Sequence, residues 1–156
     1  EGRLTKEEFD GKEVRLGELW KLVQDVNFSG FLPDEKQEVL MVLQAAPGED
    51  KQWTVPSGTL EDGETFAECC VREFYEETGF TIRTVDNVQN KSGVISEYGI
   101  SYYVEYFLVE IKSGEITFQD SDEFIHEVAW KSLEEIKMLP LSYPEDIHIL
   151  EQVLEK

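Results

Sequence analysis

The sequence marks both ends of one helix, between residues 66 and 78. Thr65 and Glu68 have the spacing of a capping box, in which the threonine hydroxyl and the glutamate carboxylate each accept a hydrogen bond from a free backbone N–H. Gly79 is the residue type that most often ends a helix in the left-handed conformation. Any fold of this chain must therefore accommodate a helix that begins after Thr65 and ends before Gly79.

The two sides of this predicted helix differ in chemistry. At about 100° per residue, its apolar side comprises Ala67, Val71, Phe74, Tyr75 and Thr78. Glu73, Glu76 and Glu77 gather on the opposite side, which we expect to face solvent. On the helix alone, a solvated acidic face is the simpler interpretation. The alternative is a metal site, because crowded carboxylates repel one another unless cations neutralise them, and Mg²⁺ and Mn²⁺ prefer oxygen ligands.

Strand-like segments surround this helix. They are predicted at residues 39–43, 53–55, 81–88, 100–111 and 127–130. The first of these is a continuous apolar run, as expected of a strand buried on both faces. Residues 22–32 also have strand character, but helical spacing is found just upstream at Leu16, Leu19, Trp20 and Val23. This first stretch is therefore ambiguous.

Two further helices are predicted near the C-terminus. Ser132 and Glu135 form a second capping box, and Pro144 suits the first position of a last helix. The chain has no repeat, linker or strict strand–helix alternation, so the elements predict an α+β domain or a layered α/β sandwich. We expect a single domain over residues 1–156.

The charge of the chain limits its partners. It has 34 acidic and 14 basic residues among 156, a formal net charge of -20. Such a surface repels long nucleic acids, which binding proteins usually meet with clusters of Lys and Arg. No apolar run is long enough to span a bilayer, and no signal peptide is recognisable at the start. We expect neither long nucleic acid nor membrane as a partner, whereas a small phosphorylated ligand is compatible if divalent cations accompany it.

The two cysteines, Cys69 and Cys70, are neighbours within the predicted helix. Adjacent cysteines cannot form an ordinary disulfide, because the geometry of the bond requires suitably directed Cβ atoms. This favours a reducing cytoplasm over a secreted disulfide scaffold. Two thiols and two scattered histidines, His126 and His148, also make a poor zinc site.

The predicted helix belongs to a longer pattern. Residues 58–80 read GTLEDGETFAECCVREFYEETGF. This segment resembles the Nudix box, which is Gly, five residues, Glu, seven residues, then Arg-Glu-bulky-x-Glu-Glu-x-Gly-bulky. Every fixed position is matched, by Gly58, Glu64, Arg72, Glu73, Phe74, Glu76, Glu77, Gly79 and Phe80. A chance match is of the order of 10⁻⁵ or less, so the resemblance favours the metal-site interpretation.

The resemblance implies a fold and a reaction. Nudix hydrolases have a mixed β-sheet sandwiched between α-helices, and they hydrolyse nucleoside diphosphates linked to a further group, with Mg²⁺ or, in its place, Mn²⁺. By resemblance, Arg72 pairs with Glu64 and holds the loop against the helix, a bidentate role that lysine fills badly. The implied metal ligands are the carbonyl of Gly58 and the carboxylates of Glu73, Glu76 and Glu77. Ser57 departs from the commoner glycine without removing a catalytic group.

The general base is open between a box glutamate, Glu76 or Glu77, and a carboxylate of a later loop. Glu123 and Glu127 are the candidates in that loop, and the alternative for both is an ordinary surface acid. His126 lies between them, but a lone histidine is more often structural. Trp130 is expected to anchor the core.

The substrate is less well specified. Family members that hydrolyse ADP-ribose usually carry a proline downstream of the box, and this chain has none between Pro56 and Pro140. Diadenosine-polyphosphate hydrolases tend to carry a tyrosine there, close to Tyr98, and the segment from Val39 to Gly58, which contains Trp53, also resembles that subfamily. Both side chains are therefore candidate substrate contacts, with a structural role as the alternative. A MutT-type nucleoside triphosphate pyrophosphohydrolase is equally compatible.

Two functional classes fit the box. The first is a Mg²⁺-dependent hydrolase of a small nucleotide, and the second is a catalytically silent Nudix-like module that senses a nucleotide. Silent modules typically lose box glutamates, and the presence of Glu73, Glu76 and Glu77 with Arg72 favours the enzyme. A monomer and a homodimer are both compatible with the sequence.

Overall fold

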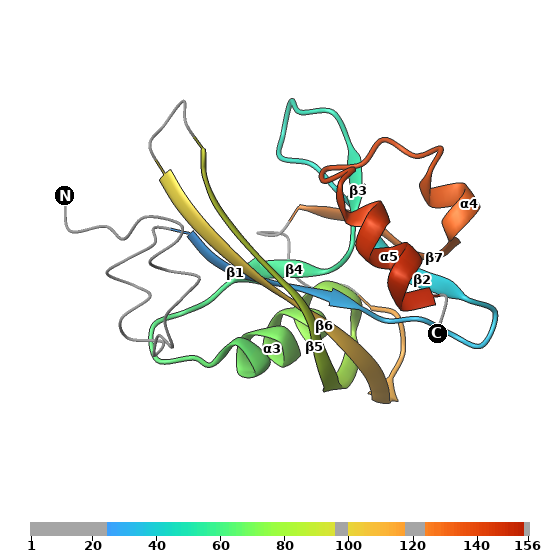
Figure 1. Ribbon diagram of the computed structural model, residues 1–156. Coiled ribbons are helices and arrows are strands. Elements are labelled where there is room, and N and C mark those ends of the chain that lie inside the picture. The colour runs from blue at the N-terminus through green and yellow to red at the C-terminus, as the bar shows by residue number, and fades with distance from the viewer. Residues whose placement is uncertain (1–24, 96–99, 118–123, 155–156) are drawn as a thin grey trace.

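Two β-sheets form the centre of the computed structural model, which describes residues 25–95, 100–117 and 124–154 (Figure 1). The four-stranded sheet has the order β4-β1-β6-β5 and comprises β1 (Asp25–Phe31), β4 (Ser57–Thr59), β5 (Phe80–Ile95) and β6 (Ile100–Gly114). The three-stranded sheet has the order β3-β2-β7 and comprises β2 (Glu38–Gln44), β3 (Gln52–Thr54) and β7 (Ile125–Ser132). The larger sheet is mixed, because β1 runs parallel to β6 and antiparallel to β4.

Helices cover the sheets from two sides (Figure 1). Helix α3 (Phe66–Thr78) packs with one hydrophobic cluster, and α4 (Leu133–Ile136) and α5 (Asp146–Leu154) pack with the other. The prediction of sheets sandwiched between helices in an α+β fold is confirmed. None of the helices in the described ranges is both long and apolar enough to cross a membrane.

Strand β2 separates the two hydrophobic clusters. Leu40 and Val42 point into the cluster beneath α3, whereas Val39 and Met41 point into the cluster beneath α5. All four side chains are at most 2% exposed. Successive side chains of a strand point to opposite faces, so a strand buried on both faces needs the unbroken apolar run that the sequence shows.

Helix α3 begins and ends where the sequence predicts. Thr65 and Glu68 form both hydrogen bonds of the capping box, and Gly79 has a left-handed φ of 88°. The predicted apolar side is partly wrong, because Tyr75 is 46% exposed whereas Phe74 is fully buried. Phe74 packs onto Gly30 of β1, where an added Cβ would lie 2.8 Å from the phenylalanine ring. The helix is therefore rotated so that Phe74, and not Tyr75, faces the sheet.

Three differences from the predicted elements concern more than the exact end of a strand. The ambiguous first stretch is a strand from residue 25, and its helical alternative, which ran upstream from Val23, lies outside the described residues. Strand β5 continues to residue 95 through the polar segment after Val88, because pairing with β6 satisfies its backbone. Helix α5 begins at Asp146, so Pro144 lies in the preceding turn and not in the first helical position.

Helix α5 is tied to the four-stranded sheet by a buried hydrogen bond. The hydroxyl of Tyr106, on β6, donates to Oδ1 of Asp146 over 3.0 Å, and both residues are almost fully buried. Burial raises the pKa of Asp146 to about 6, although the Tyr106 hydroxyl opposes the shift. Removal of the carboxylate from water disfavours its charged form, so the folded protein holds this proton more tightly than the unfolded chain.

The rotation of α3 predicts unequal effects for two neighbouring aromatic residues. Phe74→Ala leaves a cavity in the core and should lower the free energy of unfolding by about 3–5 kcal/mol. Tyr75→Ala, the matched control on the exposed side, should change it by less than about 0.5 kcal/mol. Urea unfolding of both variants tests this, and equal losses would mean that both rings lie in the core.

The raised pKa of Asp146 predicts a pH-dependent contribution to stability. The protonated carboxyl favours folding, so the contribution is complete below about pH 4 and is lost as the pH rises through about 6. Relative to Asp146→Asn, which cannot ionise, the wild type should lose up to about 3 kcal/mol over this interval. Urea unfolding of both proteins between pH 4 and 7 measures the difference, and parallel stability curves would contradict the assignment.

Candidate active site

Arg72 holds the loop before α3 against the helix. Its Nε donates to Glu64 Oε2 over 2.6 Å, and its Nη2 donates to Glu64 Oε1 over 3.0 Å. The expected bidentate pair is therefore present. The hydrogen bonds from Arg72 lower the pKa of Glu64, and the pKa of Arg72 is raised in turn. This mutual stabilisation of the charged forms fixes the loop that leads from β4 to α3.

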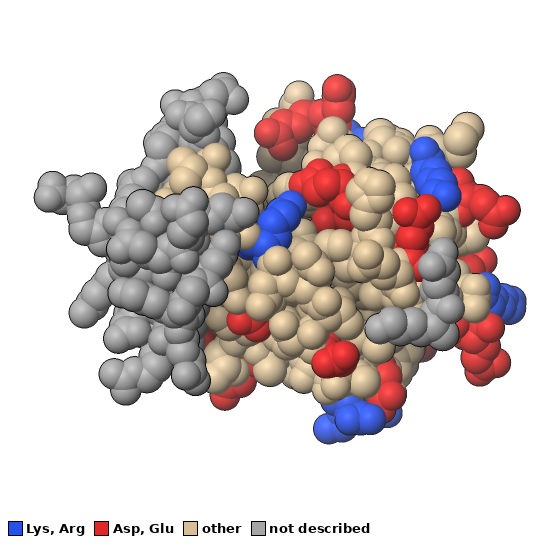
Figure 2. All heavy atoms as spheres, viewed as in Figure 1, with Lys and Arg blue, Asp and Glu red and all other residues tan. Residues whose placement is uncertain are grey.

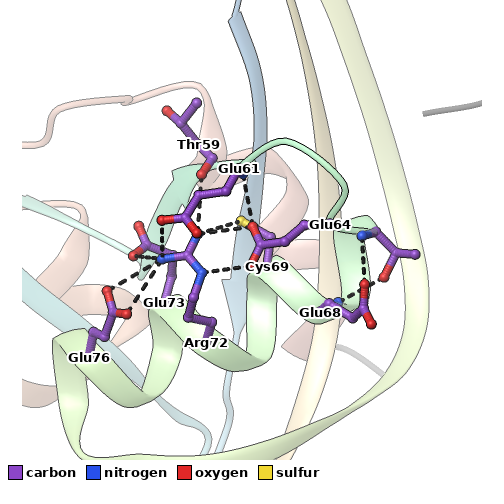
Figure 3. Close-up of polar contacts among 9 residues, drawn as sticks. Thr59, Glu61, Glu64, Glu68, Cys69, Arg72, Glu73 and Glu76 are labelled. Atoms are coloured by element: carbon purple, nitrogen blue, oxygen red, sulfur yellow. Dashed lines mark hydrogen bonds and ion pairs between the residues drawn. The ribbon is translucent and has the colours of Figure 1, made fainter. Parts of the chain in front are cut away.

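The same guanidinium contacts three more carboxylates (Figure 3). Arg72 Nη1 lies 2.9 Å from Glu73 Oε1, 3.4 Å from Glu76 Oε1 and 3.6 Å from Glu61 Oε2. One cation is thus shared among four carboxylates, counting Glu64. The cluster keeps an excess of negative charge even after Arg72 is counted, as a site for cations requires.

The prediction that the acidic side of α3 faces solvent is wrong for two of its three glutamates. Glu73 is 4% exposed and Glu77 is 1% exposed, whereas the side chain of Glu76 is 36% exposed. The buried pair lies between α3 and β4. An added Cβ on Gly58 would lie 2.0 Å from Glu73 Oε2, and the backbone N–H of Ser57 donates to Glu77 Oε1 over 3.4 Å. Only glycine at position 58 leaves room for the Glu73 carboxylate.

The donor set next to β4 fits a hard divalent cation. Carboxylate oxygens and a backbone carbonyl are the ligands that Mg²⁺ and Mn²⁺ prefer. Of the four predicted ligands, Gly58, Glu73 and Glu76 line the same cavity, and Glu77 lies beside Ser57. Within the described residues, no three acidic, histidine or cysteine side chains are yet arranged as a metal centre. Glu73 and Glu76 are instead paired with Arg72, so they could hold a cation only after turning from the guanidinium.

A cavity of about 790 Å³ lies beside this cluster. Its floor is one face of the four-stranded sheet, where the register aligns one lining residue from each strand in a row: Thr59, Asn27, Val104 and Lys91. The acidic cluster, with Glu61, Arg72, Glu73 and Glu76, lines the β4 edge of the cavity. Lys91, Tyr102, Tyr143 and Glu145 line it from β5, β6 and the turn before α5. The volume suits a small-molecule ligand.

Most of the cavity floor was not predicted as a site. Asn27 and Ser29 line the cavity, whereas Val26 and Phe28, which alternate with them along β1, point into the core. This alternation of polar and apolar residues was a usable signal, because a polar strand face inside a domain needs an explanation. Lys91 and Glu145 carried no local signal, since only the pairing of β5 with β6 and the docking of α5 bring them together.

The remaining predicted residues are placed as follows. Tyr98 and Glu123 lie outside the described residues. Glu127 is exposed on β7, opposite Leu43, and is not among the described residues that line the cavity. Trp53 is 6% exposed in the cluster beneath α5, with Lys131 Nζ 4.9 Å from the centroid of its ring, which fits the structural alternative.

Two residues of β7 have structural contacts. The Nε2 atom of His126 lies 3.2 Å from the backbone oxygen of Ala45, which fits the structural role weighed for a lone histidine. Trp130 packs against the cluster beneath α3 with its ring 6.4 Å from that of Phe80, so the expected core anchor is confirmed.

Comparison with known proteins agrees with this architecture. The family model of the NUDIX domain matches residues 23–153. The chain belongs to the Nudix family. Among sequence relatives, the 8-oxo-dGDP phosphatase NUDT18 of Mus musculus is 31% identical over 121 residues, which are 77% of this chain and 36% of that protein. The NAD-capped RNA hydrolase NudC of Haemophilus influenzae is 32% identical over 83 residues, 53% of this chain and 29% of that protein. This chain therefore spans about a third of the length of these two relatives.

Solved Nudix structures share the fold. The NUDIX domain of Shewanella oneidensis NrtR, complexed with ADP ribose, superposes with a TM-score of 0.68 at 16% identity, covering 97% of this chain and 98% of that one. The MutT protein of Methanosarcina mazei superposes with a TM-score of 0.67 at 20% identity, covering 85% of this chain and 96% of that one. At these identities the superpositions establish the architecture alone.

The bidentate bond of Arg72 predicts that lysine cannot replace it. Arg72→Lys keeps the charge but loses the planar fork, so the free energy of unfolding should fall by about 1–3 kcal/mol. Arg83→Lys is the matched control, because Arg83 pairs with Glu110 on the exposed surface of β5 and β6, where such pairs contribute about 0–1 kcal/mol. Urea unfolding compares the two, and equal small effects would show that the Glu64 pair is incidental.

Proposed function

We propose that this Nudix protein is a Mg²⁺-dependent hydrolase that cleaves the pyrophosphate linkage of a small nucleotide. The observation that carries the proposal is the acidic cluster around Arg72 at the β4 edge of the cavity. A nucleotide in a cavity of about 790 Å³ would have its phosphates within reach of this cluster. The chain has a formal net charge of -20, and Figure 2 shows acidic side chains scattered over one face with fewer basic ones among them, so the phosphates would need cations.

The candidate ligands have distinct tasks in this proposal. Glu73, Glu76 and Glu77, with the Gly58 carbonyl, would hold the cation, which supplies polarisation of a phosphoryl oxygen and lowers the pKa of a bound water. Arg72 keeps Glu64 and the loop in place and balances the charge of the cluster until the cation is bound. Charged groups that are already held in place limit how far the polar groups of the site must reorient during the reaction.

The exposed position of Glu76 makes it our preferred base among the box residues. It lines the cavity, and its carboxylate oxygens can accept a proton from a water that attacks phosphorus. Glu77 is too deeply buried to reach such a water without a rearrangement. Glu127 and Glu123, in the segment before Trp130, are the alternative bases, and their variants belong in the same assay.

The nature of the linked group stays open between a MutT-type nucleoside triphosphate and a dinucleoside polyphosphate. Both share the pyrophosphate linkage on which the cluster would act. We place the protein in a reducing compartment such as the cytoplasm, because Cys69 and Cys70 are buried free thiols. Burial raises the pKa of both thiols, so neither is a reactive nucleophile.

Turnover of a nucleotide panel tests the proposal. Nucleoside triphosphates, dinucleoside polyphosphates and nucleotide sugars are incubated with Mg²⁺ or with EDTA, and the products are identified. We expect Mg²⁺-dependent cleavage of at least one class, and a reduction in kcat of at least about 100-fold for Glu76→Gln. Glu115→Gln, an exposed carboxylate that does not line the cavity, is the control and should retain activity. Tight binding without turnover across the panel would instead identify a nucleotide-sensing module.

A further inference from the structure

An ion pair lines the cavity at the end opposite the acidic cluster. Nζ of Lys91, on β5, lies 2.9 Å from Oε2 of Glu145, in the turn before α5, and both residues line the cavity. The side chains are 30% and 53% exposed, respectively. An ion pair of this exposure contributes at most about 1 kcal/mol, because water solvates both charges when they separate. The pair can therefore open at little cost.

Lys91 is one of two cations that line the cavity in the described part of the chain, together with Arg72. Arg72 is shared among four glutamates, whereas Glu145 is the carboxylate paired with Lys91. The lining also includes Glu61, Glu73 and Glu76, so an anionic ligand meets mostly negative charge. Lys91 is the cation that such a ligand can engage without disturbing the Arg72 cluster.

The fold holds Lys91 at a definite place. In the cross-strand row Thr59, Asn27, Val104 and Lys91, the lysine lies three strands from β4, roughly 14 Å between backbones at the usual strand spacing. Its Nζ lies 6.0 Å from the ring centroid of Tyr102. The Tyr102 phenol lies over Gly93, where an added Cβ would be 2.7 Å from its oxygen. Arg72 and Lys91 both line the cavity, so their long side chains can bring the charged groups closer together than this backbone span.

The adjacent residues Glu145 and Asp146, at the start of α5, make two different contacts with the sheet. Asp146 makes the buried hydrogen bond with Tyr106, whereas Glu145 makes the exposed ion pair with Lys91. The buried bond keeps α5 docked on the sheet whether or not Glu145 is paired. Glu145 can therefore leave Lys91 without undocking the helix.

We infer that Lys91 binds a phosphate oxygen of the nucleotide, and that Glu145 is a built-in competitor which the phosphate displaces. The inference rests on the proposed function for the presence of a nucleotide in the cavity. The phosphates of a nucleotide together carry more negative charge than one carboxylate, and a phosphate oxygen forms strong charge-assisted hydrogen bonds with an ammonium group, which favours the exchange. Lys91 would then raise the affinity of the protein for the nucleotide, and Glu145 would lower it.

Binding of a non-hydrolysable nucleoside triphosphate analogue with Mg²⁺, measured by titration calorimetry, tests these opposite directions. Lys91→Met removes the charge and keeps the apolar stem, and we expect the dissociation constant to rise about tenfold. Glu145→Gln frees the lysine, and we expect the dissociation constant to fall severalfold. In the double variant the gain from Glu145→Gln should disappear, because the lysine that it frees is absent.

The exposed pair of Arg83 and Glu110, on the same two strands, supplies matched controls. Arg83→Met and Glu110→Gln should leave the dissociation constant within about twofold, since neither residue lines the cavity. If Lys91→Met and Glu145→Gln both weaken binding, or if neither changes it, the pair is only structural and the inference is wrong. Failure of the wild-type protein to bind the analogue would also overturn it.

The outcome is separable from that of the proposed function. Opposite shifts in affinity with no turnover of any nucleotide would refute the hydrolase and keep the recognition role of Lys91. Mg²⁺-dependent turnover with shifts of the same sign would keep the hydrolase and refute that role. Thermal unfolding of each variant confirms that the compared proteins are folded.

Discussion

The charge balance around Arg72 is the constraint on which the site depends. A buried carboxylate is costly unless an opposite charge or hydrogen bonds compensate it, and Glu73 and Glu77 are almost fully buried. Arg72 supplies that compensation for Glu73 and at the same time ties Glu64 to the helix. One guanidinium thus stabilises the loop, the helix and the excess negative charge that a divalent cation would neutralise.

Helix α3 and the cavity lie on opposite faces of the four-stranded sheet, yet carboxylates of α3 line the cavity. The position of β4 at the edge of the sheet explains this. Helix α3 packs on the face where Phe28 and Gly58 point, and the cavity lies on the face where Asn27 and Thr59 point. Because β4 is the last strand of this sheet, carboxylates from the helix can reach past it toward the cavity. Gly58 makes this passage possible by leaving space for Glu73.

Long-range pairing governed the parts that local sequence could not predict. The polar residues that follow Val88 have weak strand character, yet β5 continues through them because β6 supplies hydrogen-bond partners. The same pairing brings Lys91 to the cavity, and the docking of α5 brings Glu145 to Lys91. Neither residue belongs to a motif. A contact between residues 54 positions apart has no signature in any short window of sequence.

The sequence by itself determined the ends of α3, the doubly buried strand β2 and the set of residues in the box. Each depends on local chemistry: a capping pair, a glycine in the left-handed region, a continuous apolar run and fixed spacings. Tertiary structure alone decided which side of α3 is buried, and it placed Glu73 and Glu77 inside and Tyr75 outside. Helical periodicity shows which side chains share a face, but the neighbouring strands decide which face meets the protein interior.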